Sequence, residues 1–74
     1  MGTQNTRREK IEWLRGHLEM FFTKKPEGSV SREKLLSEFV LATASTWRSG
    51  IELLKVIAMI DGYKIEGDEI YKRK

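Results

Sequence analysis

Hydrophobic residues recur at helical spacing over the first third of the chain. From about residue 6 to 23 they fall on one face at about 100° per residue: Ile11, Leu14, Leu18, Phe21 and Phe22. This pattern predicts a first helix. Thr6 is its expected N-cap, with Glu9 at the reciprocal position of a capping box. Pro26 follows soon after, where proline cannot continue a helix.

The middle of the chain predicts two more helices joined by a short turn. One runs from about Arg32 to Leu41 with Ser31 as N-cap, and its hydrophobic face is Leu35, Leu36, Phe39 and Val40. The other runs from about Thr46 to Ile60. It opens with polar residues and becomes hydrophobic later, at Leu53, Leu54, Val56, Ile57, Met59 and Ile60. We therefore expect this third helix to be exposed at its N-terminal end and buried toward its C-terminal end.

The last part of the chain predicts a β-hairpin. Gly62 suits the left-handed position that ends a helix, and two short strands follow, at about residues 63–66 and 69–72. The dipeptide Gly67-Asp68 between them suits a type II′ turn, and in that register Ile65 faces Ile70. Earlier in the chain, Ser29-Val30 is too short for more than a one- or two-residue strand segment.

A second stripe follows the opposite face of the first helix. It consists of Trp13, Gly16, His17 and Met20, at spacings i, i+3, i+4 and i+7. A Trp and a Met flanking a Gly would let two copies of this helix approach closely about a two-fold axis, which predicts a homodimer through helix one. The alternative is that Trp13 and Met20 are scattered surface residues or fold under the N-terminal leader.

Composition narrows the function mainly by exclusion. The chain has 74 residues, no cysteine and one histidine, so a disulfide framework, a cysteine-rich zinc site and a thiol nucleophile are excluded. His17 has no second metal-ligating residue at suitable spacing, and neither Ser45 nor Ser49 has a histidine base nearby. We expect no enzyme activity, metal or cofactor. The absence of cysteine and of a signal peptide indicates a cytoplasmic protein, and the sequence predicts no membrane contact.

Charge permits a nucleic-acid partner without demanding one. Fourteen basic and eleven acidic residues give a net charge of +3. The predicted domain organisation is a disordered leader at residues 1–6, a single domain at 7–72 and a basic tail at 73–74.

The turn before the third helix, the start and later hydrophobic positions of that helix, and the hairpin together form a recognisable pattern. Its residues are Leu41-Ala42-Thr43-Ala44-Ser45-Thr46-Trp47-Arg48-Ser49-Gly50, Leu53-Leu54, Ile57, Gly62, Ile65, Gly67-Asp68 and Ile70-Tyr71. Over about residues 8–72 the chain resembles the small winged-helix proteins common in archaea, their plasmids and their viruses. Ala44 stands where many members have Gly. The resemblance implies a mainly α (α+β) winged helix-turn-helix fold, in which three helices precede a two-stranded β-hairpin, the wing. In that family the residues opening helix three read the major groove of double-stranded DNA.

The third helix offers the best candidates for DNA contact. Projected on a helical wheel, its polar face lies away from Gly50, Ile51, Leu54 and Ala58 and carries Ser45, Arg48, Ser49, Glu52 and Lys55. Arg48 can pair with guanine, Ser45, Thr46 and Ser49 can bond phosphates or bases, and Lys55 can bind phosphate. The alternative is a solvated face with an internal ion pair between Glu52 and Lys55 or Arg48. Trp47 points inward on the wheel, yet its place in the first turn can leave it partly exposed.

Other parts of the chain supply secondary candidates and a conflicting signal. Arg32 and Lys34, at the positive end of helix two, are candidates for flanking phosphates, and Lys64 for a backbone contact beside the wing. The wing tip, however, carries three carboxylates that phosphates repel, at Glu66, Asp68 and Glu69, so we expect no insertion of the tip into DNA. Two functions therefore stay open: a dimeric, DNA-binding transcriptional regulator, or a winged-helix module that binds a protein partner in a replication, transcription or membrane-remodelling assembly.

Overall fold

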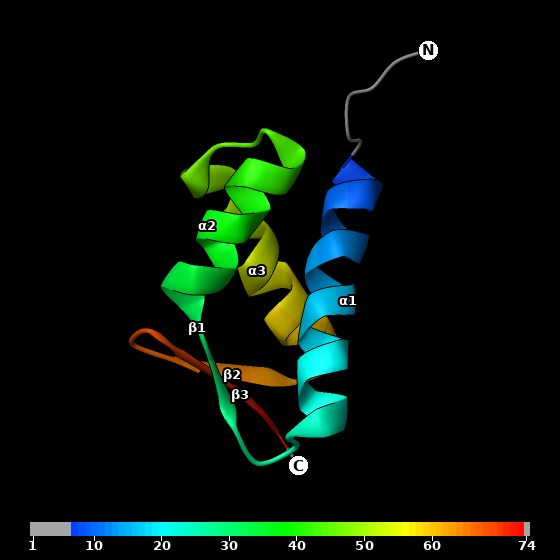
Figure 1. The fold of residues 1–74 in the computed structure, drawn as a ribbon, viewed down its shortest axis with the longest axis vertical. Helices are drawn as coiled ribbons and strands as arrows, with labels where there is room; N and C mark the ends of the chain where they lie inside the picture. Colours follow the sequence, from blue (N-terminus) through cyan, green and yellow to red (C-terminus); the bar gives the residue numbers. More distant parts are fainter. Residues whose placement is uncertain (1–6, 74) are drawn as a thin grey trace.

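Residues 7–73, the part of the chain that this computed structural model describes, form three α-helices and three short β-strands (Figure 1). In chain order they are α1 (Arg7–Lys24), β1 (Ser29–Ser31), α2 (Arg32–Thr43), α3 (Trp47–Asp61), β2 (Tyr63–Glu66) and β3 (Glu69–Lys72). The α+β class, the three helices and the two hairpin strands are confirmed. The predicted leader, the Thr6 cap and Lys74 lie outside the described residues.

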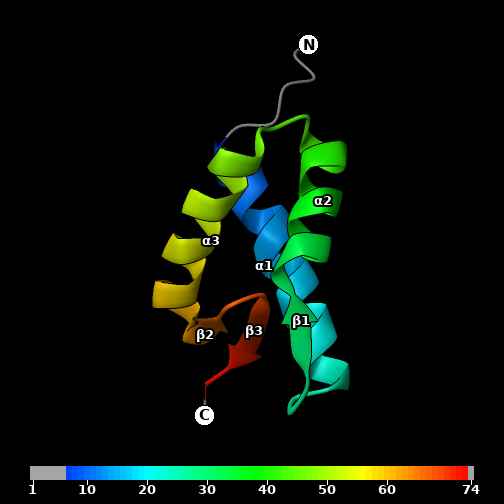
Figure 2. The same ribbon diagram turned by 90° about the vertical axis from the view of Figure 1, so that its left-hand side faces the viewer.

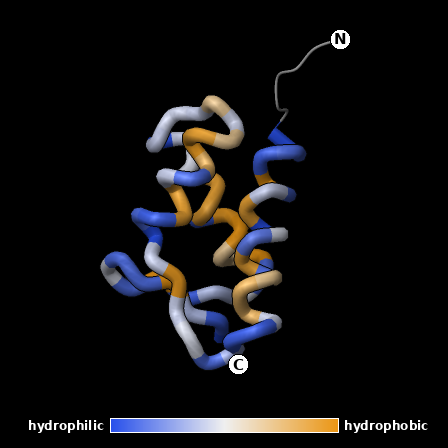
Figure 3. The backbone as a smooth tube through the Cα atoms, viewed as in Figure 1, coloured by the Kyte–Doolittle hydropathy of each residue, from blue (hydrophilic) through white to orange (hydrophobic). Residues whose placement is uncertain are grey.

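The core forms where the hydrophobic faces of the helices meet above the sheet, and Figure 3 shows the hydrophobic stretches gathered toward the middle of the molecule. Its buried members come from every helix and from the hairpin: Leu14, Leu18, Phe22, Leu35, Leu36, Phe39, Leu53, Leu54, Ile57, Tyr63 and Ile70. Gly50 lets α3 approach α2 closely. A Cβ atom there would lie 2.8 Å from Cδ2 of Leu36 and 3.0 Å from Cδ2 of Phe39.

The helix ends follow local capping rules with one departure. Ser31 caps α2 by accepting a hydrogen bond from the backbone nitrogen of Lys34, as predicted, and Thr46 caps α3 by accepting from that of Ser49. Gly62 ends α3 with φ of 78°, in the left-handed region that glycine adopts freely. Ala44 ends α2 in the same region, with φ of 54°, although an alanine side chain disfavours it.

The sheet has three strands, so the prediction of a two-stranded wing is incomplete. β1 pairs antiparallel with β3, in the order β1-β3-β2, and Val30 lies opposite Ile70. The strand forms because β3 offers a free edge and Val30 packs against the core beside it. The predicted register of Ile65 with Ile70 is confirmed. In the turn, Gly67 has a positive φ of 58°, and the φ of Asp68 is not positive. A type II′ turn requires this combination.

The expectation that α3 is buried toward its C-terminal end is wrong at its last residues. Met59 and Ile60 are 81% and 70% exposed, whereas Gly50 near the start is buried. The physical reason is that α3 packs along one face, so position around the helix decides burial. Within residues 7–73, no helix is long and apolar enough to cross a membrane.

Candidate nucleic-acid interface

The outward face of α3 presents a short row of charged side chains. Arg48, Glu52 and Lys55, at spacings i, i+4 and i+7, are all exposed, while Gly50 and Leu54 on the other face are buried. Among the ion pairs formed by residues 7–73, none joins Glu52 to either cation. Arg48 and Lys55 are therefore available to an anionic partner, and the alternative of an internal ion pair on this face is not what the structure forms.

The residues that open α3 are only partly available. Ser45 is buried, and its hydroxyl accepts a hydrogen bond of 2.8 Å from the hydroxyl of Thr43, so it is absent from the exposed face. Thr46 is exposed, but its hydroxyl accepts from the Ser49 nitrogen at 3.1 Å as the helix cap. Trp47 is 41% exposed, so the wheel's inward placement holds only in part.

The β2–β3 turn reaches the start of α2. One oxygen of Asp68 accepts from the Ser31 hydroxyl at 2.8 Å and the other from the Glu33 nitrogen at 2.9 Å. The backbone oxygen of Asp68 also accepts from the Arg32 nitrogen at 2.7 Å. The Asp68 carboxylate thus lies at the positive end of α2, where the sequence predicts a DNA phosphate. Sequence reasoning missed this contact because Ser31 and Asp68 are 37 positions apart.

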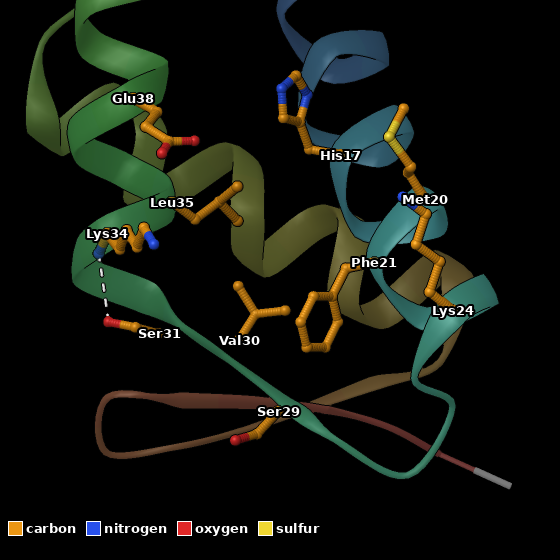
Figure 4. A pocket seen from close by; sticks show the side chains of 10 residues that line it. All are labelled: His17, Met20, Phe21, Lys24, Ser29, Val30, Ser31, Lys34, Leu35 and Glu38. Atoms are coloured by element: carbon orange, nitrogen blue, oxygen red, sulfur yellow. Dashed lines mark hydrogen bonds between the residues drawn. The ribbon is translucent and has the colours of Figure 1, made fainter.

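Three predicted DNA contacts outside α3 are accordingly dispersed. Arg32 is half-buried at the start of α2, and its Nε atom is buried with no hydrogen-bond partner among the described residues. Lys34 lines a groove between α1 and α2 (Figure 4). Lys64 pairs with Glu66 at 3.1 Å on the hairpin. The structure therefore gathers Arg48, Ser49 and Lys55 on α3, with Thr46 as its N-cap. Arg32, Lys34 and Lys64 belong to other elements.

The stripe predicted on α1 is partly absorbed by the chain's own core. The Trp13 ring packs edge-on against Phe39, with centroids 5.7 Å apart, and stacks on His17 at 3.8 Å. Nδ1 of His17 lies 2.9 Å from the backbone oxygen of Trp13, so it carries the proton and donates. Gly16, His17 and Met20 are exposed, Met20 by 63%. A partner would meet Met20 and the edges of the stacked rings.

A bidentate ion pair ties α1 to the end of α3. Nε and Nη2 of Arg15 donate to the Asp61 carboxylate at 2.7 and 2.9 Å. Beside it, burial raises the pKa of the Tyr63 phenol above its usual 10.0; Asp61 and Glu19 add to this, and Arg15 opposes it. This contact joins the middle of α1 to the last residue of α3.

Comparisons with known proteins give this chain no relatives: no family model, no curated protein and no solved structure matches it. Among the described residues there is also no group of three or more acidic or histidine side chains placed to hold a metal ion. The surface of α3 therefore has to be interpreted from its own geometry.

Proposed function

We propose that the chain is a winged-helix DNA-binding protein, a dimeric transcriptional regulator that reads the major groove with α3. The observation that carries the proposal is the outward face of α3, where Arg48 and Lys55 are exposed and form no ion pair with any of residues 7–73. The order of helices and strands supports the proposal, because in a winged helix the third helix precedes the hairpin and carries the base contacts.

Each residue of this face has a distinct proposed role. The Arg48 guanidinium reads guanine through its two acceptors, and Lys55, two turns farther along, holds a phosphate. Ser49 and the Thr46 hydroxyl lie at the groove edge, where short polar side chains reach the backbone. Ser45 has no part in this proposal because it is buried.

The acidic hairpin tip stays outside the DNA. In both ribbon views the first turn of α3 and the strands lie toward opposite ends of the molecule (Figures 1 and 2). Asp68 is engaged with the start of α2, and Glu66 with Lys64. Contact through α3 therefore does not bring these carboxylates against phosphates.

The proposed dimer forms through α1, with two α3 helices meeting successive major grooves about 34 Å apart on a palindromic site. Met20 supports this dimer because it is an exposed apolar residue one turn after Gly16, where an added Cβ atom would meet nothing within 4 Å. This dimer and DNA binding are separate parts of the proposal and are tested separately.

The test is a fluorescence-anisotropy titration of labelled random duplex DNA at two salt concentrations, followed by selection of a preferred site. We expect binding that weakens steeply with salt, because phosphate contacts release counterions. Arg48→Ala should weaken binding to the selected site by about 1–3 kcal/mol, and Lys55→Ala should weaken all duplexes alike and reduce the salt slope by about 1. Lys25→Ala removes the same charge from an exposed position after the end of α1 and serves as the control. Unchanged affinity of Arg48→Ala for the selected site removes Arg48 from base readout.

A second candidate is a winged-helix module that binds protein. The exposure of Met59 and Ile60 at the end of α3 favours it, since a DNA-reading helix gains nothing from apolar side chains there. Absence of any binding to duplex DNA at low salt would select this candidate.

A further inference from the structure

A groove opens between α1 and α2, above β1, with a volume of about 550 Å³ (Figure 4). Phe21, Val30 and Leu35 point toward one another along its floor. Lys24 lines it from α1, and Lys34 from α2. α3 lies behind this floor in Figure 4, so the groove opens on the side opposite the outward face of α3.

The groove and the stripe on α1 form one continuous surface. His17 and Met20 belong to the stripe and also line the groove. The stripe alone offers little apolar area, because Trp13 is already packed against Phe39. A stable interface needs about 800 Å² from each partner, so a partner that covers Met20 must extend over the groove as well.

We propose that a second copy of this chain fills the groove, with α1 of each copy lying along the groove of the other about a two-fold axis. Met20 of each copy then packs over the floor of its partner's groove, and each contact occurs twice. This deepens the dimer in the proposed function and rests on it, because it names α2 as the second wall of the interface.

Three charged side chains line the groove, Lys24, Lys34 and Glu38, so its lining is net basic. Glu19 lies on the flank of α1 away from Phe21, and Glu12 on the same flank already pairs with Arg8 at 3.4 Å. A copy of α1 lying in the groove would bring Glu19 toward Lys34 on α2. Neither Lys24 nor Lys34 has an ion pair within residues 7–73, and Glu19 has none there either.

The experiment is sedimentation equilibrium of the full chain over a range of concentrations, with circular dichroism to verify that each variant folds. We expect a dimer for the wild type. Met20→Glu should raise its dissociation constant at least about thirtyfold, as at a buried anchor. Lys34→Glu should raise it about tenfold, because two-fold symmetry reverses two exposed ion pairs at once. The matched controls are Met59→Glu, an exposed methionine on α3, and Lys25→Glu, a lysine outside the groove; both should leave the constant unchanged.

The outcomes separate the inference from the function on which it rests. A monomer at every concentration overturns both the groove and the dimer. If Met20→Glu dissociates the dimer but Lys34→Glu does not, the dimer interface is confined to α1, so the groove inference is wrong while the proposed dimer stands. DNA binding is measured in parallel on the wild type. If the wild type does not bind DNA, the proposal of DNA readout is wrong, and the sedimentation result alone then tests the groove inference.

Discussion

α1 and α3 each contain one glycine, Gly16 in the middle of α1 and Gly50 in the first turn of α3, and the two glycines meet different surroundings. Around Gly50 in α3, a Cβ atom would lie within 3.2 Å of the Leu36 and Phe39 side chains. Around Gly16 in α1, it would meet nothing within 4 Å. Glycine at position 50 is therefore needed for α3 to pack closely against α2. Glycine at position 16 leaves open space on α1 that a partner could enter. The difference comes from what lies across each helix.

The largest effect should come from filling the close contact on α3. Gly50→Ala forces the added methyl group against Leu36 and Phe39, both fully buried, and overpacking of this kind costs about 1–3 kcal/mol. The helix preference of alanine offsets about 1 kcal/mol. We expect a net loss of up to about 2 kcal/mol, measured by urea unfolding. A gain in stability of about 1 kcal/mol, the full helix preference of alanine, would mean that the two helices can separate at no cost.

The comparison extends to the ends of α2 and α3, where Ala44 and Gly62 adopt the same left-handed backbone. Ala44→Gly should raise stability by about 0.5–1 kcal/mol, because relief of the alanine strain exceeds the entropy that glycine adds to the unfolded chain. The reciprocal change, Gly62→Ala, should lower it. A thermal unfolding series of both variants measures the pair, and a stabilised Gly62→Ala would contradict the left-handed conformation at that end.

A smaller gain should follow from Gly16→Ala, the counterpart of the α3 change. The methyl group enters open space on an exposed helix, so stability should rise by about 0.5–1 kcal/mol through helix propensity alone. The measurement is made at low protein concentration, so that self-association does not contribute. A loss of stability in Gly16→Ala under those conditions would show that this position is not open.

The smallest effect concerns the place where α1 and α3 meet, at Tyr63. The raised pKa means that the folded chain holds the phenolic proton more tightly than the unfolded chain. Stability from the neutral phenol is therefore complete below pH 10.0 and is lost as pH rises through the higher folded-state pKa. Between about pH 9 and 11, the range in which tyrosine side chains titrate, Tyr63→Phe should lose less stability than the wild type or Tyr71→Phe. Identical pH profiles would show that burial of Tyr63 does not affect its titration.

Much of the candidate site could be read from periodicity, and the exceptions have a common cause. Arg48 and Lys55 follow from the helical wheel, since their neighbours at Gly50 and Leu54 form the buried face. On the same wheel Ser45 projects onto the exposed face. It precedes the first residue of α3, however, and lies in the turn between α2 and α3, where it is buried. A wheel is valid only inside the helix, and the residues that open a helix take their orientation from the turn before them.

The sequence by itself determined the features that depend on neighbours in the chain. These are the hydrophobic faces of the helices, the Ser31 cap, the left-handed Gly62 and the register of Ile65 with Ile70, because helix and hairpin geometry relates residues a few positions apart. Only the tertiary structure decided the pairing of β1 with β3, the contact of Asp68 with the start of α2 and the groove between α1 and α2. Each joins segments far apart in the chain, and no local pattern records which distant surface will meet a given face.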